Sequence, residues 1–321
     1  MKYSDHAPAL KYGAKIYPED IAGMIGLPSV GNIWYVDPGK SVSGSGRTQE
    51  DAFKTVGEAY NAMVADNDDV CVIAPSSSTG RTSETATLTW AKRRTHIVGN
   101  GPLRRGWNRA GIAFASTVTT PSMTISANNC SFTNFMIYNS NDVNVLVNHT
   151  GDYNTFNYVH FAGIANATTG DDTAGRCIVL TGSDDNQFNN CMFGIDTVQS
   201  SDANAQIELA TGSARNAFRD CVITHWSDNA GSLFVIADGT NDIDRYVLFD
   251  HCWFHNPIHS GGTNNTVGMN LGADIGGAVF LWDSWLTGAT DWADDFTLLY
   301  GMGNMEQLAT QATAGIEKVL A

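Results

Sequence analysis

Three side chains that can carry acid–base chemistry, Asp220, His251 and Asp283, occupy equivalent positions in successive repeats of the sequence. If each repeat is one turn of a coil of strands, neighbouring turns lie about 4.8 Å apart, and Asp220 and Asp283 are about 9.6 Å apart. That separation is near the upper limit for the carboxylate pair of an inverting glycosidase, and His251 would lie between the two acids. If the protein is an enzyme, we expect these three residues to be catalytic.

The same position also has a simpler explanation in the backbone. A sharp corner in the chain favours residues that tolerate the left-handed conformation, above all Asn and Asp. The position reads Asn134, Tyr158, Asn190, Asp220, His251 and Asp283. We therefore favour a structural role for these acids over a catalytic one.

The repeat that defines these positions is the pattern apolar-x-x-apolar-x-apolar, which recurs at intervals of roughly thirty residues from Phe132 to Leu286. A straight strand alternates its faces with period two, so the first and fourth positions point inward together only if the chain bends at the third. No single turn of such a coil buries its own face, and several stacked turns are needed for stability. The pattern predicts an all-β solenoid of parallel strands.

The inward positions predict a packed ladder of aromatic and thiol side chains. Its members are Phe188, Cys191, Phe218, Cys221, Phe249 and Cys252. A reactive or metal-binding thiol needs an electropositive or ligand-rich setting, and these cysteines have apolar neighbours. The sequence contains no CxxC pair and no HExxH unit. We expect reduced buried thiols, no metal site and no cofactor.

The outward fifth position of the repeat is unusually apolar. It includes Met192, Val222, Trp253 and Trp285, and Trp282 points outward from the second position of the last repeat. A contiguous apolar strip on a soluble coil is usually covered. We expect another subunit to cover it, with a homotrimer as the first choice; a bound glycan and the chain's own loops are the alternatives.

The ends of the chain depart from the repeat. We expect an N-terminal arm over residues 1–32, a β-helix over 33–290 that includes a capping helix at 48–65, and a C-terminal segment over 291–321 that contains a helix. Thr48 and Asp51 would cap the first helix. The apolar stripe expected for the second helix is Met305, Leu308, Ala312, Ile316 and Val319.

The charge balance limits the partners. The chain has 18 Lys and Arg against 33 Asp and Glu, a formal net charge of −15. Such a surface repels nucleic acid, anionic lipid and polyanionic sugars. Between Arg109 and Lys318 the basic residues are Arg176, Arg215, Arg219 and Arg245, which argues against a lyase acting on uronic sugars. The N-terminus shows no signal peptide and no window could span a membrane, so we expect synthesis in a cytoplasm.

The opening segments carry a family resemblance. The order "WYVDPG", "AFKTVGEAYNAM", "DVCVIAP" and "THIVGNG", followed by repeats with Asn at the corner, resembles the right-handed parallel β-helix proteins of the pectate-lyase-like superfamily. That group includes many phage virion proteins and tailspikes. The resemblance implies that the 48–65 helix caps one end of the coil, but it identifies no reaction.

From these features we expect a non-enzymatic structural protein of a phage virion. It would be a head decoration or an appendage such as a tail or fibre protein, located in the virion, with other virion proteins and copies of itself as partners. The alternatives are a tailspike-like carbohydrate-active enzyme, either a glycan hydrolase or a lyase, and a glycan-binding receptor module without catalysis.

Overall fold

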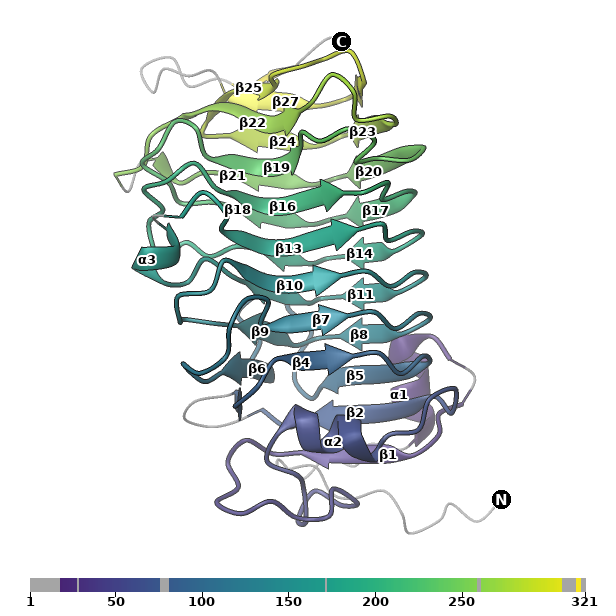
Figure 1. Cartoon of the computed structure of the whole chain (residues 1–321). Helices are drawn as coiled ribbons and strands as arrows, with labels where there is room; N and C mark the ends of the chain where they lie inside the picture. Colours follow the sequence, from purple (N-terminus) through teal and green to yellow (C-terminus); the bar gives the residue numbers. More distant parts are fainter. Residues whose placement is uncertain are drawn as a thin grey trace.

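The protein is a coil of three long parallel sheets (Figure 1). The computed structural model describes residues 18–27, 29–75, 81–170, 172–258, 261–307 and 316–318. Each full turn supplies one strand to sheet A, one to sheet B and one to sheet C, in that order along the chain. The predicted fold class, an all-β parallel β-helix, is confirmed.

The strands pair in parallel from one turn to the next, except that β27 and β28 of sheet B are antiparallel. Sheet A consists of β1 (Ile33–Val36), β2 (Asp69–Ile73), β5 (Thr95–Gly99), β8 (Ser131–Thr133), β11 (Thr155–Asn157), β14 (Gln187–Asn189), β17 (Asn216–Arg219), β20 (Tyr246–Asp250), β23 (Ala278–Trp282) and β26 (Leu299–Met302). Sheet B consists of β3 (Thr82–Glu84), β6 (Gly111–Phe114), β9 (Met136–Tyr138), β12 (His160–Ala162), β15 (Met192–Phe193), β18 (Val222–Thr224), β21 (Trp253–His255), β24 (Trp285–Thr287), β27 (Met305–Gln307) and β28 (Ile316–Lys318). Sheet C consists of β4 (Leu88–Trp90), β7 (Met123–Ile125), β10 (Val145–His149), β13 (Arg176–Thr181), β16 (Ala205–Ala210), β19 (Leu233–Ala237), β22 (Asn265–Leu271) and β25 (Ala289–Ala293).

The bend between sheets A and B lies at the third position of the repeat, as the pattern predicts. All six residues of that position have a left-handed backbone, with φ between 42° at Asp283 and 60° at Asn134. Left-handed φ is costly for a residue with a side chain, and Asn and Asp are the types that bear it best. The backbone requirement for this column is therefore real, and the side chains at the corner project outward.

The inside of the coil holds the aromatic and thiol ladder in register. The Phe188 and Phe218 rings stack with centroids 4.6 Å apart, and Phe218 and Phe249 stack at 4.8 Å. The thiols are fully buried and donate to carbonyl oxygens one turn below, for example Cys221 Sγ to Phe188 O at 3.3 Å. Burial raises the pKa of Cys221 and Cys252 well above the ordinary thiol value, so these thiols are unreactive.

The turn from sheet C to sheet A holds a second ladder that the sequence analysis missed. Asn154, Asn186 and Asn216 are buried one above another. The Asn186 side-chain oxygen accepts from Asn154 N at 2.9 Å, and the Asn216 oxygen accepts from Asn186 N at 3.0 Å. The ladder gives each turn a hydrogen-bond acceptor for a buried backbone N–H, which would otherwise be left unpaired at a cost in free energy.

The helix at the N-terminal end of the coil is shorter than predicted. Helix α2 spans Val56–Ala62, not 48–65, and the third short helix, α3, spans Ala167–Gly170. The N-cap of α2 is Thr55, which forms a capping box with Glu58, so the Thr48–Asp51 cap is wrong. Phe53 precedes the helix because it bridges to Val36 in a strand-like contact. The buried face of α2 still lies against the end of the core.

Glu84 on β3 holds the start of α2 in place, and its removal is expected to destabilise the protein. The buried carboxylate accepts from Val56 N at 2.8 Å and Gly57 N at 3.1 Å. Glu84→Ala leaves both donors buried without an acceptor, and we expect it to lower the free energy of unfolding by about 2 to 4 kcal/mol in urea titrations. Glu58→Ala on the exposed side of the same helix is the control, with an expected loss near 1 kcal/mol. Equal losses for the two variants would contradict this role.

The predicted N-terminal arm is partly folded onto the coil. Helix α1 spans Pro18–Ile25, and its Ile21 and Ile25 pack on the outward side chains Val70, Val72 and Val98 of sheet A. Residues 1–17 lie outside the described residues. The first turns of sheet A are therefore covered from outside by the chain's own helix.

The C-terminal segment differs from the prediction. The parallel coil continues past residue 290, because β26 pairs with β23 and Leu299 lies beside Val279. Met305 and Ile316 lie in the strands β27 and β28, so the predicted helix is wrong at these positions. Leu308, Ala312 and Val319 lie outside the described residues. The apolar spacing that suggested a helix is shared by short strands joined by a turn, and periodicity alone does not separate the two.

Candidate active site

Polar and charged side chains gather on the outer face of sheet A between β17 and β23. The last residue of each strand and the corner residue after it both project outward there. In register, these pairs are Arg219 and Asp220 on one turn, Asp250 and His251 on the next, and Trp282 and Asp283 on the third. The stacking of turns brings three carboxylates, one imidazole and one guanidinium onto one exposed patch, which we call the acidic cluster.

A short hydrogen bond links the imidazole to a carboxylate at the centre of this cluster. His251 Nδ1 lies 2.6 Å from Asp250 Oδ1. This bond raises the pKa of His251 above its usual value, and the charges of Asp250, Asp283 and Asp220 add to the effect. The His251 side chain is 57% exposed, so its Nε2 edge is open to a ligand. A protonated His251 oriented by Asp250 is arranged as a general acid.

Arg219 forms the other side of the cluster. Its Nε lies 4.0 Å from Asp250 Oδ2, and its Nη1 donates to the Gln187 side-chain oxygen. Asp250 thus lies between a guanidinium and an imidazole. Asp220 and Asp283 are exposed at the corners above and below His251. Either carboxylate could accept a proton from a water molecule that attacks a bound substrate.

Aromatic side chains border the cluster on the same sheet. Trp282 is 40% exposed and Tyr300 on the next turn is 52% exposed. Phe280 stacks on Tyr300 with centroids 5.4 Å apart, and the Tyr246 ring meets Phe280 edge-on at 5.9 Å. Flat aromatic surfaces beside hydrogen-bonding groups are the usual composition of a site that binds a ring with an apolar face and polar edges.

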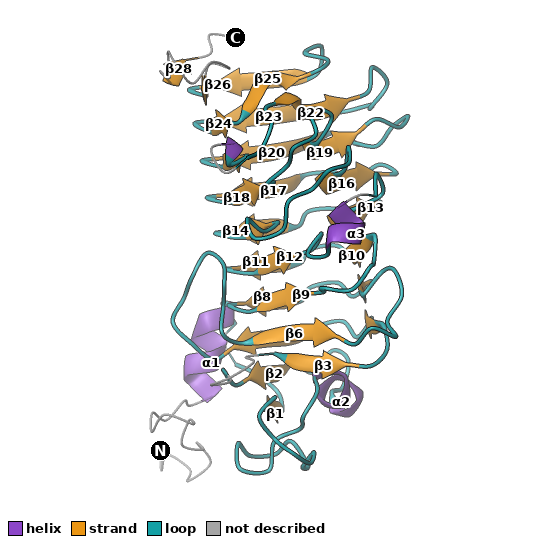
Figure 2. Cartoon of the chain, turned by 90° about the vertical axis from the view of Figure 1, so that its left-hand side faces the viewer, coloured by secondary structure: helices purple, strands orange, loops and turns teal. Residues whose placement is uncertain are grey.

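The loop between β5 and β6 runs along the sheet B side of the coil (Figure 2). It covers part of the column of outward residues on that sheet. Trp107 N in this loop donates to His160 Nδ1 at 3.1 Å. Gly106 packs against the Met192 side chain, and its positive φ of 131° favours glycine there. Met192 and Val222 are partly buried, whereas Trp253 and Trp285 are 38% and 44% exposed. The chain's own loop covers the N-terminal part of the column only.

Assembly through the exposed tryptophans of sheet B remains a prediction. If a second copy buries Trp253 and Trp285, replacing both with serine is expected to weaken association more than tenfold, because each buried ring contributes about 1.5 kcal/mol or more. Sedimentation equilibrium would measure this, with Val42→Ser, an exposed residue outside this surface, as the control. A wild type that is monomeric at all concentrations, or a double variant that associates as wild type does, would contradict the prediction.

Two members of the acidic cluster were missed in the sequence analysis. Arg219 and Asp250 lie at the second position of the repeat, immediately before the corner. The sequence analysis placed Asp220, His251 and Asp283 in one column, and the structure adds Asp250 and Arg219 beside them. The second position of the repeat could have revealed them, because a polar residue directly before a polar corner residue projects from the same outer face.

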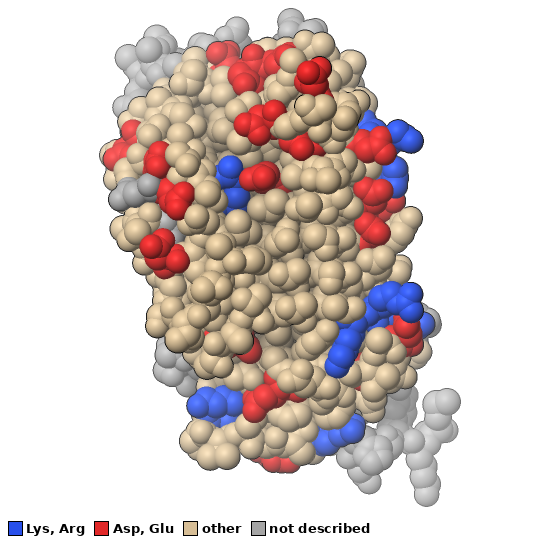
Figure 3. Space-filling view, viewed as in Figure 1, with Lys and Arg blue, Asp and Glu red and all other residues tan. Residues whose placement is uncertain are grey.

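Acidic side chains are prominent on the surface of the coil (Figure 3). Acidic side chains spread over the C-terminal half of the face shown in Figure 3. Among the residues that the structure describes, no helix is long and apolar enough to cross a membrane. In the same residues, no group of three His, Cys, Asp or Glu side chains is arranged to hold a metal ion.

Comparisons with known proteins identify the fold and no family. No protein family matches the sequence, and no curated protein matches it. The pectin methylesterase of Aspergillus niger aligns with a TM-score of 0.56 and 15% identity over 90% of each chain. Pectate lyase Pel9A aligns with a TM-score of 0.57 and 16% identity over 81% of this chain and 64% of the lyase, and a rhamnogalacturonan lyase with 0.54 and 16% over 80% and 68%. At this identity the likeness shows the right-handed parallel β-helix fold alone.

These comparisons contradict the prediction that the protein is not an enzyme. The three solved structures named above, each covering four fifths or more of this chain, are an esterase and two lyases. The prediction rested in part on attributing the corner acids to backbone geometry. The left-handed corners are present, and the same residues also join a cluster with His251, Asp250 and Arg219.

Proposed function

We propose that the protein is a carbohydrate-active enzyme that hydrolyses a glycan bound on the outer face of sheet A. The observation that carries the proposal is the His251–Asp250 pair, held between the exposed carboxylates Asp220 and Asp283 and bordered by Trp282. The fold neighbours support it in a general way, since their names identify proteins that act on pectin, pectate and rhamnogalacturonan. The virion location and the virion partners expected from the sequence remain predictions.

The cluster favours hydrolysis over elimination. A lyase needs cationic groups to neutralise a uronate and a base to remove a proton, and Arg219 is the one permanent cation beside the three carboxylates of the cluster. A hydrolase needs an acid for the departing oxygen and a base for water. Protonated His251 would give its Nε2 proton to the glycosidic oxygen. Asp220 or Asp283 would take a proton from the water that attacks the anomeric carbon, and the bond from that carbon to the glycosidic oxygen would break.

The charge of the molecule limits the substrate. The net charge of −15 and the three cluster carboxylates repel a polyanion such as a polyuronate. A neutral glycan meets no such barrier, and its sugar rings can stack on Trp282 and Tyr300. The proposed substrate is therefore a neutral polysaccharide.

The proposal is tested by incubating the protein with a panel of neutral and acidic polysaccharides. Two products are measured, new reducing ends and unsaturated sugars that absorb in the ultraviolet. New reducing ends without unsaturation, on a neutral member of the panel, would support hydrolysis. Unsaturated products would show a lyase, and binding without any cleavage would show a glycan-binding module; either result would overturn the proposal.

A further inference from the structure

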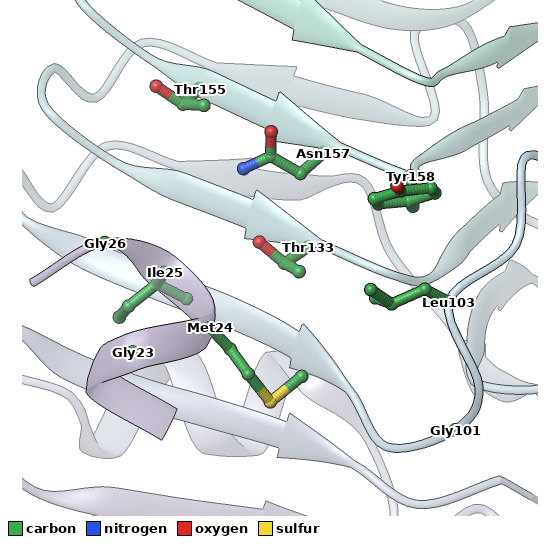
Figure 4. Close-up of a pocket in the computed structure, with 10 residues that line it drawn as sticks. All are labelled: Gly23, Met24, Ile25, Gly26, Gly101, Leu103, Thr133, Thr155, Asn157 and Tyr158. Carbon is green, nitrogen blue, oxygen red and sulfur yellow. The ribbon is translucent and has the colours of Figure 1, made fainter. Parts of the chain in front are cut away.

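A pocket lies on the same outer face of sheet A, closer to the N-terminus of the coil. It has a volume of about 610 Å³ and lies between helix α1 and the β5–β6 loop (Figure 4). Met24 comes from the helix and Leu103 from the loop. Thr133 ends strand β8, Asn157 ends strand β11, and Tyr158 is the corner residue after β11. The sequence analysis gave no sign of this pocket, because its walls come from segments far apart in the chain.

The lining suits a sugar ring. The partly exposed Thr155 and Asn157 offer a hydroxyl and an amide from the floor, where Thr133 is buried, and the Tyr158 ring lies at one side (Figure 4). The Asn157 oxygen accepts from Asn189 Nδ2 at 3.0 Å, which fixes the orientation of this amide. Met24 and Leu103 are 37% and 56% exposed, apolar side chains that a ligand would cover. Polar groups below an apolar rim match the edges and faces of a pyranose.

The pocket and the acidic cluster lie on one continuous face. The strands β8, β11, β14, β17 and β20 follow one another in sheet A. At about 4.8 Å per turn, Thr133 in the pocket is roughly 19 Å from the turn that holds Asp250 and His251. The outward residues between them are uncharged as far as Asn189, so an extended neutral chain can lie along the coil axis from the pocket to the cluster.

Helix α1 closes this face at its N-terminal end. It packs over Val70, Val72 and Val98, the outward residues of β2 and β5, and Met24 borders the pocket from that side (Figure 4). The opposite end has no such cover in the described residues, since Trp282, Tyr300 and Met302 are exposed. A glycan that follows the face toward the N-terminus of the coil therefore meets a wall at the pocket.

From the proposed hydrolysis, on which this inference rests, we infer that the pocket binds the terminal sugar of the glycan and sets the length of the product. With the chain end held against α1, cleavage at the acidic cluster releases an oligosaccharide of one size. That size corresponds to about one sugar unit per turn of the coil, three or four units in all. The protein acts at a fixed distance from a chain end rather than at random along the chain.

Gly101 borders the pocket and has space for a side chain. An added Cβ at Gly101 meets no atom within 4 Å, and the backbone there is not left-handed. We expect wild type and Gly101→Ala to release one dominant oligosaccharide from the neutral polysaccharide they cleave, seen by mass spectrometry at early times. Gly101→Trp is expected to cut at least tenfold more slowly and to give a product shorter by one sugar.

Binding is measured separately so that the pocket is tested even if no glycan is cleaved. Oligosaccharides of three to eight units, prepared by partial acid hydrolysis of the panel polysaccharides, are titrated into wild type, Gly101→Ala and Gly101→Trp by calorimetry. If wild type and Gly101→Ala bind an oligosaccharide and Gly101→Trp does not, the result supports the pocket as a binding site. If the same result comes without any cleavage, the pocket stands and only the proposed hydrolysis is refuted. Equal binding by all three proteins, no binding by any of them, or a random product mixture unchanged in Gly101→Trp would overturn the inference.

Discussion

Replacement of His251 by glutamine is expected to lower kcat by a factor of about 10² to 10⁴, the usual contribution of a general acid. Glutamine keeps a polar side chain at the left-handed corner and removes the imidazole whose Nε2 proton would be transferred. Because the His251 side chain is exposed, the melting temperature should change little. Initial rates of reducing-end release on the cleaved polysaccharide measure the effect.

The pH profile separates this role from a structural one. Asp250 raises the pKa of His251 above its usual value, so wild-type activity should fall as pH rises through a pKa higher than that of a free histidine. Asp250→Asn removes the largest cause of the shift and should move the fall to lower pH. A profile that is the same in wild type and Asp250→Asn, or a His251→Gln protein with full activity, would show that His251 does not act as the acid.

Acid is expected to destabilise the protein strongly through three buried histidines. Burial lowers the pKa of His149 to about 3 and the pKa values of His160 and His225 to about 4. The unfolded chain takes up these protons near pH 6.5, whereas the folded protein takes them up only at its lowered values. Their full contribution is present above pH 6.5 and is lost as pH falls toward 4. In this range each buried histidine lowers the free energy of unfolding by about 1.4 kcal/mol for every pH unit that the pH falls.

Urea titrations at several pH values measure this dependence. His149→Phe removes one buried titrating group and should make the free energy of unfolding fall less steeply between pH 6.5 and 4.5, by about 1.4 kcal/mol per pH unit. His251→Gln is the control, because an exposed histidine with a raised pKa is protonated in both states over this range. The same slope in wild type and His149→Phe would contradict the assignment.

The repeat made the coil predictable in physical terms. The inward positions of a parallel β-helix stack on themselves, so Phe188, Phe218 and Phe249 repeat their type and reveal the register. Every corner must adopt left-handed φ, so the third position repeats its preference for Asn and Asp. The ends follow no such rule. Helix α2 begins at Thr55 because Phe53 first bridges to a strand, a long-range contact that a local capping pattern does not contain.

The candidate site was predictable only in part. The column of Asp220, His251 and Asp283 follows from the spacing, but the same spacing also explains those residues as corner formers. Asp250 and Arg219 support the functional explanation, because no corner requires either of them. Asp250 contacts the corner imidazole, and Arg219 lies 4.0 Å from Asp250. The pocket under α1 depends on how the helix and the β5–β6 loop pack on the coil, and no sequence pattern encodes that packing.

The central claim is that the acidic cluster on sheet A cleaves a glycan. The most direct measurement compares reducing-end release by wild type, Asp250→Asn and Asp291→Asn on the panel polysaccharides, where Asp291 is an exposed aspartate of sheet C. We predict that wild type and Asp291→Asn cleave the same neutral polysaccharide at equal rates and that Asp250→Asn is at least a hundredfold slower. Equal activity of Asp250→Asn and wild type, or no release of reducing ends by wild type from any member of the panel, would contradict it.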